Sequence, residues 1–476
     1  MAGDGSTGQL EPPHKRWTAI LDQLNQYRNE AQRAPLNPNA QFNHGWAASR
    51  AGLWQEAVAA YERALDLSIS DPEEVYCNLA SIYSEQLGRT EAALNTLSKA
   101  LALNHKYYPA HFNRAHLYEQ LGDRDLAVAG FLAAADLEPH NPQPIVRAAD
   151  ASPLEQLTPT LLTRLTKFAE ADDIDALFAL AKIEEQRGNT ASAWDSLTRA
   201  NTLDAKGRKP WPIKALSDRL FAIAEQPLPR LTNSNGPVFI AGMFRTGSTL
   251  LEQILAAHGA FSPLGESEFW PRRIAAMGGG MVLPARGLPN ELACRELARA
   301  FEQHSKQRIS DANVRVTDKR PDNIYHIALI ARVLPNARFI ITERDWRDTL
   351  LSVWGTRLHP QHGYAHDLEG IRQQIDLCQQ LASIWQQQAP DRVYRLPYEA
   401  LIDDPEATLR DLLAWLGEAW DPKCLGFHEQ RNAVRTASVW QVREPLHGGR
   451  RDRWRRYEPQ LRSILGATLD QSVPAS

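Results

Sequence analysis

Residues 237–258 read PVFIAGMFRTGSTLLEQILAAH, and this stretch combines an apolar run, a loop bounded by two glycines and a helical pattern. The run over residues 237–241 is short, apolar and partly β-branched, which predicts a buried strand. Apolar side chains then recur at three- and four-residue spacing from Leu250, which predicts a helix. A strand, a glycine-bounded loop and a helix in this order are typical of a phosphate cradle, because loop N–H groups and the positive helix end face the anion.

The loop has the G-x-x-x-x-G spacing of a P-loop but not the residues of a nucleoside triphosphatase. Ser248 stands where the P-loop lysine belongs, and Arg245 is the one cation inside the loop. The sequence therefore predicts a cradle for an anion that needs no γ-phosphate–metal arrangement. A chance pair of glycines between a strand and a helix would give the same pattern, so the loop alone leaves both interpretations open.

The composition is that of an ordinary globular protein with two or three domains. The chain has 476 residues, of which 43% are hydrophobic and 23% are charged. Its net charge of −4 gives no reason to expect nucleic acid, and no apolar run approaches the roughly 20 residues of a membrane span. The first residues lack an apolar segment and the four cysteines are scattered, so we expect a cytoplasmic protein with reduced thiols, no signal peptide and no metal site.

The first half of the chain repeats itself with a period of about 34 residues. Each copy has a glycine, an alanine five residues later and another alanine twelve residues later. The glycines are Gly52, Gly88, Gly122 and Gly188, the first alanines are Ala57, Ala93, Ala127 and Ala193, and the second alanines are Ala64, Ala100, Ala134 and Ala200. Small side chains let two helices approach, and glycine turns the chain between them, so the pattern predicts a solenoid of helix–turn–helix units.

These units resemble the tetratricopeptide repeat (TPR), with four clear copies and a diverged one between Asn141 and Asp173. The resemblance implies a concave groove that binds a partner protein or the substrate. A purely structural or dimerising role fits the repeats equally well. Prolines and the segment LTNSNG at residues 231–236 end the helical pattern, so we place a domain boundary there. The predicted organisation is a disordered N-terminus (1–14), a helical solenoid (15–225), a linker (226–236), an α/β domain (237–465) and a flexible C-terminus (466–476).

Strands and helices alternate after the boundary, which predicts a parallel sheet with helices on both faces. Further strands are expected at 315–318, 338–342 and 393–396, and helices at 292–307, 323–334 (amphipathic), 346–354 and 405–416. Arg245, Lys319, Arg344 and Tyr398 each lie just past a predicted strand. Because ligands of such sheets bind at the carboxyl ends of the strands, we expect these four side chains to converge on one crevice.

Residues 236 to about 457 resemble the sulfotransferases that use 3′-phosphoadenosine 5′-phosphosulfate (PAPS), and among them the tyrosylprotein sulfotransferases. The sequence GMFRTGSTLLEQILAAH resembles the family's 5′-phosphosulfate loop, and RFIITERDWRDTLLSVW resembles its 3′-phosphate segment. TDKRPDN, YEALIDDPEATL and TASVWQVREPLHGGRRDRW are weaker matches in the right order. The resemblance implies an α/β P-loop-like domain with a central parallel sheet, and its pairing with TPR repeats resembles a bacterial domain arrangement.

Two positions of the loop depart from the family pattern. Phe244 stands where the family usually has proline, and residues 246–249 read Thr-Gly-Ser-Thr in place of Ser-Gly-Thr-Thr. Both changes keep the hydroxyls and the glycine, so we expect them to reshape the mouth of the cradle and not to abolish binding.

The resemblance assigns roles to individual residues. Arg245, which is also among the expected catalytic groups, would cradle the 5′-phosphosulfate together with Thr246, Gly247, Ser248 and Thr249. Lys319 matches the catalytic lysine, which neutralises the bridging oxygen as its bond to sulfur breaks. Arg344 and Ser352 would hold the 3′-phosphate, whereas Arg347 and Asp348 are expected as solvated charges at the start of a helix.

Tyr398, Ser438 and Arg453 match weaker family positions around the nucleotide, with Arg453 in place of a lysine seen in the tyrosylprotein branch. The basic run at 450–456 could close over the nucleotide or form a plain surface strip. Glu266 resembles the family's catalytic base, and Glu268 is the second choice because the spacing from the loop is about one residue longer than in the tyrosylprotein branch.

The sequence thus predicts a PAPS-dependent sulfotransferase without a metal, which transfers a sulfuryl group to the hydroxyl of a peptide tyrosine or a carbohydrate. A lipid or secondary-metabolite acceptor stays open. The alternatives are an ATP-dependent P-loop kinase, which would need the missing loop lysine, and a TPR scaffold with an inactive transferase domain, which would be expected to lack Arg245, Lys319 or Arg344.

Overall fold

The structure is a computed structural model that describes residues 13–471 except residues 234, 285–286, 310, 312, 431 and 437. Most of the predicted disordered N-terminus and the last five residues lie outside this range. The chain divides into two compact units, one of residues 1–110 with 268–288 and the other of residues 111–267 with 289–476. This division does not follow the domain boundaries expected from the sequence, which stay a prediction.

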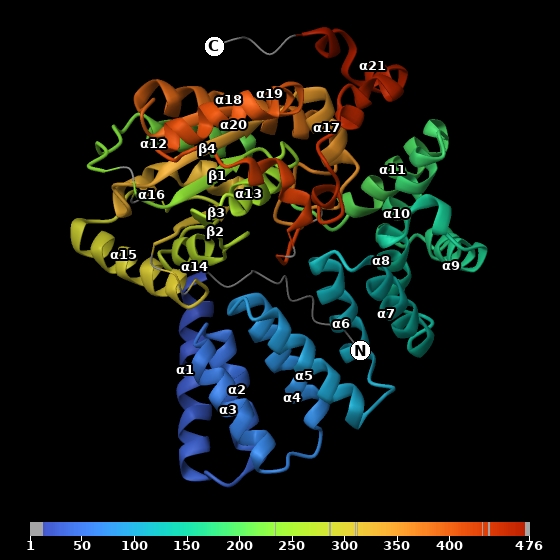
Figure 1. Ribbon diagram of the computed structural model, residues 1–476, viewed down its shortest axis with the longest axis vertical. Helices are drawn as coiled ribbons and strands as arrows, with labels where there is room; N and C mark the ends of the chain where they lie inside the picture. Colours follow the sequence, from blue (N-terminus) through green and yellow to red (C-terminus); the bar gives the residue numbers. More distant parts are fainter. Residues whose placement is uncertain are drawn as a thin grey trace, which may run out of the picture. The chain divides into compact units, whose positions relative to one another are not determined.

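The first unit is helical and contains the first two repeats (Figure 1). Its elements are α1 (Pro13–Arg33), α2 (Pro38–Arg50), α3 (Trp54–Asp66), α4 (Pro72–Ser81), the π-helix η1 (Ile82–Gln86), α5 (Thr90–Leu103) and α14 (Phe269–Ala276). Gly45 in α2 lies so close to Tyr61 in α3 that a Cβ would come within 2.8 Å of the ring. The small residue therefore lets the two helices of the repeat approach each other.

The second unit continues the repeats from within α6. Its repeat helices are α6 (Tyr108–Leu121), α7 (Arg124–Leu137), α8 (Gln143–Ala151), α9 (Pro159–Glu170), α10 (Ile174–Gln186) and α11 (Thr190–Ala205). The four turn glycines of the repeat have φ between 65° and 84°, and the eight repeat alanines are fully buried. The predicted helix–turn–helix repeat is therefore confirmed, and α8 with α9 forms the diverged copy.

A five-stranded parallel sheet forms the core of the second unit, as predicted. Its strands are β1 (Val238–Gly242), β2 (Phe261–Pro263), β3 (Arg315–Lys319), β4 (Arg338–Glu343) and β5 (Val393–Pro397), in the order β2-β3-β1-β4-β5. β1 is central and every residue in it is buried. Val238 and Ile240 face one side, whereas Phe239 stacks on Phe339 and contacts Phe301 on the other.

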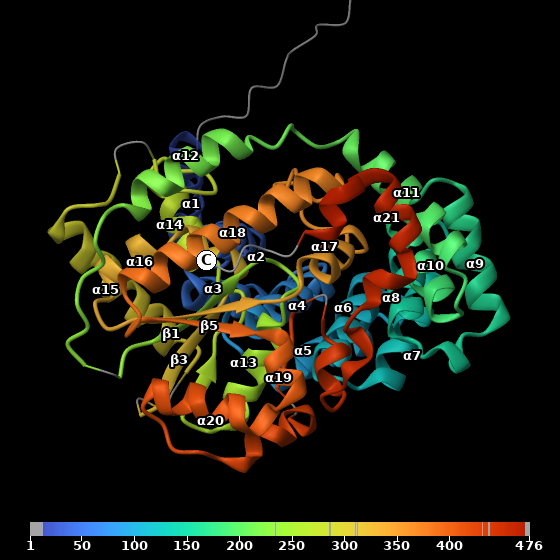
Figure 2. The ribbon, with the colours of Figure 1, turned by 90° about the horizontal axis from the view of Figure 1, so that it is seen from above.

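Helices cover both faces of this sheet (Figure 2). On one face lie α13 (Ser248–Ala257), α19 (Tyr398–Asp403), α20 (Pro405–Leu416) and the 3₁₀ segment η4 (Pro422–Glu429). On the other lie α15 (Glu291–Lys306), α16 (Ile327–Val333) and α18 (Leu368–Gln388), with α12 (Ile213–Ala224) and α17 (Trp346–Trp354) packed against α18. The chain then forms α21 (Glu458–Leu465) and the short η8 (Gly466–Asp470).

The structure corrects one predicted element and adds several others. The expected amphipathic helix at 323–334 is a 3₁₀ segment, η3 (Pro321–Tyr325), followed by α16, and α16 is buried except for Arg332 because it packs between the sheet, α15 and η3. The short edge strand β2 and the 21-residue helix α18 were not predicted. The helices predicted at 346–354 and 405–416 have the predicted bounds.

Candidate active site

One predicted site residue follows or ends each of the five strands. Because the strands are parallel, their carboxyl ends lie at one edge of the sheet. Arg245 follows β1, Glu266 follows β2, Lys319 ends β3, Arg344 follows β4 and Tyr398 follows β5. A cavity of about 420 Å³ opens at this edge, and its lining includes Arg245, Gly247, Ser248, Thr249, Glu266, Arg344, Ser352, Tyr398 and Ser438. Of the four side chains expected to converge, Arg245, Arg344 and Tyr398 therefore line one cavity, whereas Lys319 is fully buried and is not among the lining residues.

The backbone of the loop after β1 is in an unusual conformation. Arg245 has a φ of 71°, in the left-handed region, which non-glycine residues rarely adopt. Gly247 caps α13 with a φ of 99°, and a Cβ at this position would lie 2.9 Å from the ring of Tyr398. The first residues of α13 therefore line the cavity with the positive end of a helix, which suits an anion.

Thr246 stabilises this loop by hydrogen bonds within the loop and to β4. Its Oγ1 donates to the carbonyl of Met243 at 2.7 Å and pairs with the hydroxyl of Thr342 at 2.7 Å. The side chain is buried and is not among the residues that line the cavity. The structure therefore places the Thr246 hydroxyl where it fixes the loop to β4.

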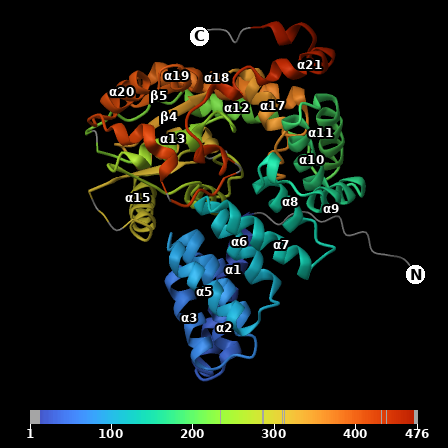
Figure 3. The same cartoon turned by 45° about the vertical axis from the view of Figure 1, so that its right-hand side comes forward.

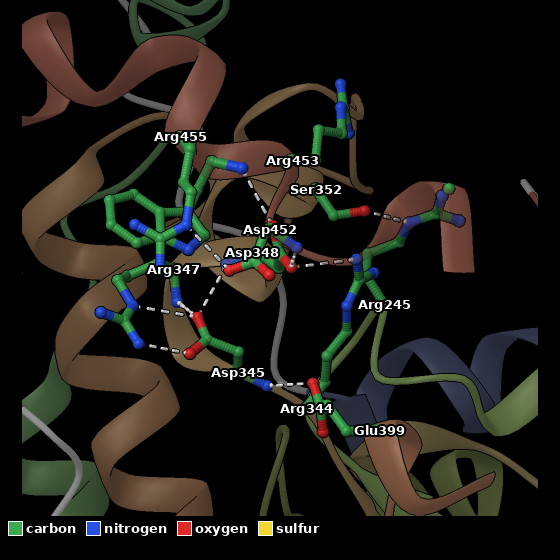
Figure 4. A network of polar contacts seen from close by, with 12 residues as sticks. Arg245, Arg344, Asp345, Arg347, Asp348, Ser352, Glu399, Asp452, Arg453 and Arg455 are labelled. Atoms are coloured by element: carbon green, nitrogen blue, oxygen red, sulfur yellow. Dashed lines mark hydrogen bonds and ion pairs between the residues drawn. The ribbon is translucent and has the colours of Figure 1, made fainter. Parts of the chain in front are cut away.

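The guanidinium of Arg245 bonds to side chains of two segments that are far from it in the sequence, and Figure 4 shows the one that carries Ser352. It donates to the hydroxyl of Ser352 at 3.1 Å, to that of Ser438 at 2.6 Å and to the side-chain oxygen of Gln441 at 3.3 Å. The two serines were predicted from separate motifs, and the structure brings both to the predicted arginine. Gln441 lines the cavity as well and was not predicted.

Arg344 lies in the same cavity between a ring and a carboxylate. Its guanidinium carbon is 4.9 Å from the centre of the Tyr398 ring, and its Nη2 is 3.7 Å from Oδ2 of Asp348. Stacking on an aromatic ring and pairing with a carboxylate hold the guanidinium in place. The planar fork of an arginine suits an oxyanion such as a phosphate.

The expectation that Asp348 is a solvated charge is wrong. Asp348 is 2% exposed, and it accepts the backbone N–H groups of Asp452 at 2.8 Å and Trp454 at 3.0 Å (Figure 4). Burial raises its pKa, and the nearby Arg344 opposes this change. Arg347 is partly buried because it pairs with Asp345 at 2.6 Å and stacks on Trp454. Asp348 therefore joins the C-terminal segment to α17, beside Arg344.

Arg453, on the same C-terminal segment, pairs with a repeat helix. Its Nε and Nη2 both bond to the carboxylate of Glu185 on α10, and Arg453 is not among the residues that line the cavity. Its role at the nucleotide stays a prediction. Of its neighbours, Arg455 and Arg456 are exposed, as a surface strip would be.

Lys319 and Glu266 form a direct ion pair. The ammonium of Lys319 is 2.5 Å from Oε1 of Glu266, and Lys319 is fully buried whereas the Glu266 side chain is 37% exposed. Glu266 lines the cavity. Glu268 is exposed at the N-cap of α14, in the first compact unit. The proposed acid–base and charge-neutralising groups are thus within reach of each other.

Two buried carboxyl groups behind this pair were missed from the sequence. Glu252 on α13 accepts the N–H of Gly265 at 3.1 Å, and burial raises its pKa to about 7 although Lys319 opposes the change. Asp318 is fully buried in β3, and burial raises its pKa to about 8. A lone carboxylate within the apolar run LLEQIL was the available signal for Glu252.

The repeat helices also contribute to the cavity. His116, Glu119 and Gln120 of α6 and Arg147 of α8 are part of the lining. No motif connected these residues with the α/β domain, because their approach depends on the tertiary fold of the second unit.

All four cysteines are buried and unpaired with one another. Within the described part of the chain, no group of three or more His, Cys, Asp or Glu residues could hold a metal ion. None of the helices that the structure describes has both the length and the apolar character to cross a membrane.

Models of known protein families match two separate parts of the chain. A family model described as "Sulfotransferase family" matches residues 237–422, and two tetratricopeptide-repeat models match residues 85–122 and 108–141. An uncharacterized protein of Aquifex aeolicus is 27% identical over 307 residues, which are 60% of this chain and 40% of that protein. A putative protein-tyrosine sulfotransferase of Caenorhabditis briggsae is 25% identical over 210 residues, 42% of this chain and 71% of that protein.

A solved structure with a weak likeness is the sulfotransferase domain from the Synechococcus PCC 7002 olefin synthase. It is 17% identical, covers 53% of this chain and 94% of that domain, and has a TM-score of 0.36. The chain thus spans about two fifths of the length of the Aquifex aeolicus protein and about seven tenths of that of the Caenorhabditis briggsae protein.

Proposed function

Because residues 237–422 carry a sulfotransferase-family domain, we propose that this chain is a PAPS-dependent sulfotransferase that transfers a sulfuryl group to an acceptor hydroxyl. The observation that carries the proposal is the arrangement at the sheet edge, where all five strands contribute a site residue and Lys319 lies 2.5 Å from Glu266. A phosphate cradle, two arginines and a lysine–glutamate pair at one edge are what sulfuryl transfer from a nucleotide requires.

The residues of the cavity fit the anionic groups of PAPS. Arg245 and the first residues of α13, including Ser248 and Thr249, supply donors for the 5′-phosphosulfate. Arg344 and Ser352 supply a guanidinium and a hydroxyl for the 3′-phosphate, and the Tyr398 ring holds Arg344 in position. Thr246 would act through the loop conformation, and Arg453 could reach the nucleotide only by leaving Glu185.

In the proposed reaction, Glu266 accepts the proton of the acceptor hydroxyl as its oxygen bonds to sulfur. The bond between sulfur and the bridging phosphate oxygen breaks at the same time, and Lys319 neutralises the charge that develops on that oxygen. The products are a sulfate ester and adenosine 3′,5′-bisphosphate. Positioning and electrostatic stabilisation dominate such a transfer, by analogy with phosphoryl transfer.

The choice of an enzyme rests on the residues at the sheet edge, whereas the choice of acceptor rests on the family resemblance. The presence of Arg245, Lys319 and Arg344 at one edge favours an enzyme over an inactive scaffold, and the missing loop lysine disfavours an ATP-dependent kinase. A peptide tyrosine and a carbohydrate hydroxyl are the acceptors that the resemblance favours. Binding of a partner protein by the repeats and a cytoplasmic location are further parts of the proposal.

The test is transfer of radiolabelled sulfate from PAPS to a panel of hydroxyl acceptors by wild type and by Lys319→Met. We expect transfer by wild type, a loss of about 100-fold or more in kcat for Lys319→Met, and little change in the affinity for adenosine 3′,5′-bisphosphate. Equal kcat values for wild type and Lys319→Met would contradict the assigned role of the lysine. Transfer of phosphate from ATP in place of sulfate would contradict the sulfotransferase proposal.

A further inference from the structure

Part of the cavity wall comes from the repeat helices and has no role in the proposed nucleotide site. α6 carries His116, Glu119 and Gln120 into the lining, and α8 carries Arg147. The residues proposed for the phosphates of PAPS lie in the transferase domain, so the repeat wall is left for the acceptor. We propose that α6 and α8 select the acceptor, and that it is an uncharged, hydroxyl-rich molecule of the carbohydrate class. This inference rests on the proposed function.

The repeat wall is fixed to the transferase domain within the second unit. The carbonyl of Gln120, at the end of α6, accepts the N–H of Val434 at 2.9 Å and Nη2 of Arg443 at 2.8 Å. Its side-chain oxygen accepts Nε of Arg435 at 3.1 Å, and Gln120 is 4% exposed. These bonds place the end of α6 beside the segment that carries Ser438 and Gln441.

The later repeats are attached to the transferase domain in the same way. Arg357, beyond α17, pairs with Asp175 of α10 at 2.8 Å and with Asp204 of α11 at 3.2 Å. Asn201 of α11 donates to the carbonyl of Trp354 at 3.0 Å. Figures 1 and 3 show α10 and α11 beside α17. A wall with this support has a defined geometry, as a specificity site requires.

The wall offers hydrogen bonds without net charge. Arg147 bonds to the carboxylate of Glu119, which is 2% exposed, so the two charges compensate each other. The side chain of His116 is 45% exposed; partial burial and the nearby arginines lower its pKa, and the neutral imidazole offers one donor and one acceptor. Arg435 and Glu444 add one charge of each sign to the lining.

A compensated wall favours neutral polar groups over an anionic acceptor. An arginine whose charge is already paired still has N–H groups that can donate to hydroxyl oxygens. A wall of donors and acceptors, in which Glu119 and Gln120 are buried, also disfavours a purely apolar chain, because its polar groups would lose their hydration without new partners.

Phe244 adds an aromatic surface to this polar lining. It lines the cavity from the loop after β1, and its ring contacts His362 edge-on with centres 4.7 Å apart. Leu358 is a further apolar lining residue. The C–H face of a sugar ring packs on an aromatic side chain while its hydroxyls bond to polar groups, and this cavity presents both kinds of surface.

The test compares Arg147→Met with a matched control, Lys182→Met. Lys182 pairs with Asp150 at 2.9 Å, which is the equivalent ion pair between the next two repeats, and Lys182 is not among the lining residues. Transfer of radiolabelled sulfate from PAPS is measured with chitotriose and with an uncharged tyrosine peptide. Binding of adenosine 3′,5′-bisphosphate is measured on each variant by calorimetry.

We expect wild type to prefer chitotriose and Arg147→Met to lower kcat/KM for chitotriose by at least about tenfold, as for a lost hydrogen bond to a charged group. Bisphosphate affinity should not change, and Lys182→Met should leave both measurements at wild-type values. If Arg147→Met fails to fold because it removes the arginine partner of the buried Glu119, the double variant Glu119→Gln/Arg147→Met removes the buried charge as well and should show the same loss.

Three results would overturn the inference. They are preference for the peptide, an equal loss for both acceptors in Arg147→Met, and an equal loss in Lys182→Met. Bisphosphate binding without transfer to chitotriose would overturn this inference and leave the nucleotide site intact. Absence of both bisphosphate binding and transfer to any acceptor would overturn the proposed function, and this inference with it.

Discussion

Replacing Glu252 by glutamine is expected to stabilise the protein at alkaline pH and to change its stability little at acid pH. Glu252 is 3% exposed, and its Oε1 accepts the N–H of Gly265. Burial raises the pKa of this carboxyl to about 7, Lys319 opposes the change and Glu266 adds to it. Glutamine keeps the accepting oxygen and the volume, and it resembles the protonated acid.

The sign follows from the proton bound by each state. Because the pKa in the folded protein is about 7 and the ordinary value is 4.5, the folded state keeps the proton over an interval in which the unfolded chain has released it. The stabilisation that the proton on Glu252 contributes is therefore fully present below about pH 4.5 and is lost as the pH rises to about 7. At about 1.4 kcal/mol for each pH unit, the loss over this interval amounts to about 3–4 kcal/mol.

The assay is hydrogen exchange of the amides in α13 and β1, followed by mass spectrometry at about pH 5 and about pH 8. A local measurement is needed because the chain has two compact units and need not unfold in one step. After correction for intrinsic exchange rates, Glu252→Gln should gain about 2–3 kcal/mol over wild type between the two pH values. The exposed Glu302 gives a control, Glu302→Gln, that should change little. An equal difference between Glu252→Gln and wild type at both pH values would refute the reasoning.

Two further substitutions test the geometry of the site. Gly247→Ala places a Cβ 2.9 Å from the Tyr398 ring at a φ of 99°. We therefore expect adenosine 3′,5′-bisphosphate to bind at least about tenfold more weakly in a calorimetric titration. Unchanged affinity would show that the loop adapts. Asp348→Ala leaves the N–H groups of Asp452 and Trp454 without their acceptor, which costs about 1–3 kcal/mol for each group. Limited proteolysis should therefore cut the C-terminal segment faster than in wild type. Equal cleavage rates would contradict the role of Asp348.

The sequence predicted the elements whose signals are local. The strand at 237–241 and the helices at 346–354 and 405–416 follow from unbroken apolar patterns with clear ends, because Asp345 and Asp404 cap the two helices. The repeats were predictable for the same reason, since their small residues recur at a fixed period. The helix at 323–334 was wrong in its exposure, because burial on all sides depends on neighbours that a period cannot reveal.

The site was predictable where motifs mark the ends of strands. The cavity is lined by four predicted residues, Arg245, Glu266, Arg344 and Tyr398. They lie together because parallel strands end at one edge of the sheet, and the motifs had identified the residues that follow the strands. Asp348 was misjudged because its partners are backbone N–H groups more than 100 residues away. The repeat wall was missed for the same reason, since contacts between α6 and the segment near Val434 arise only in the folded second unit.

The most direct test of the central claim is a calorimetric titration of wild type and Arg344→Ala with adenosine 3′,5′-bisphosphate and, separately, with ATP and Mg²⁺. Arg347→Ala is the matched control, because Arg347 pairs with Asp345 and is not among the lining residues. We predict that wild type and Arg347→Ala bind the bisphosphate, that Arg344→Ala loses about 10- to 100-fold in affinity, and that ATP gives no signal. Binding of ATP with Mg²⁺, or bisphosphate affinity that is the same in wild type and Arg344→Ala, would contradict the account.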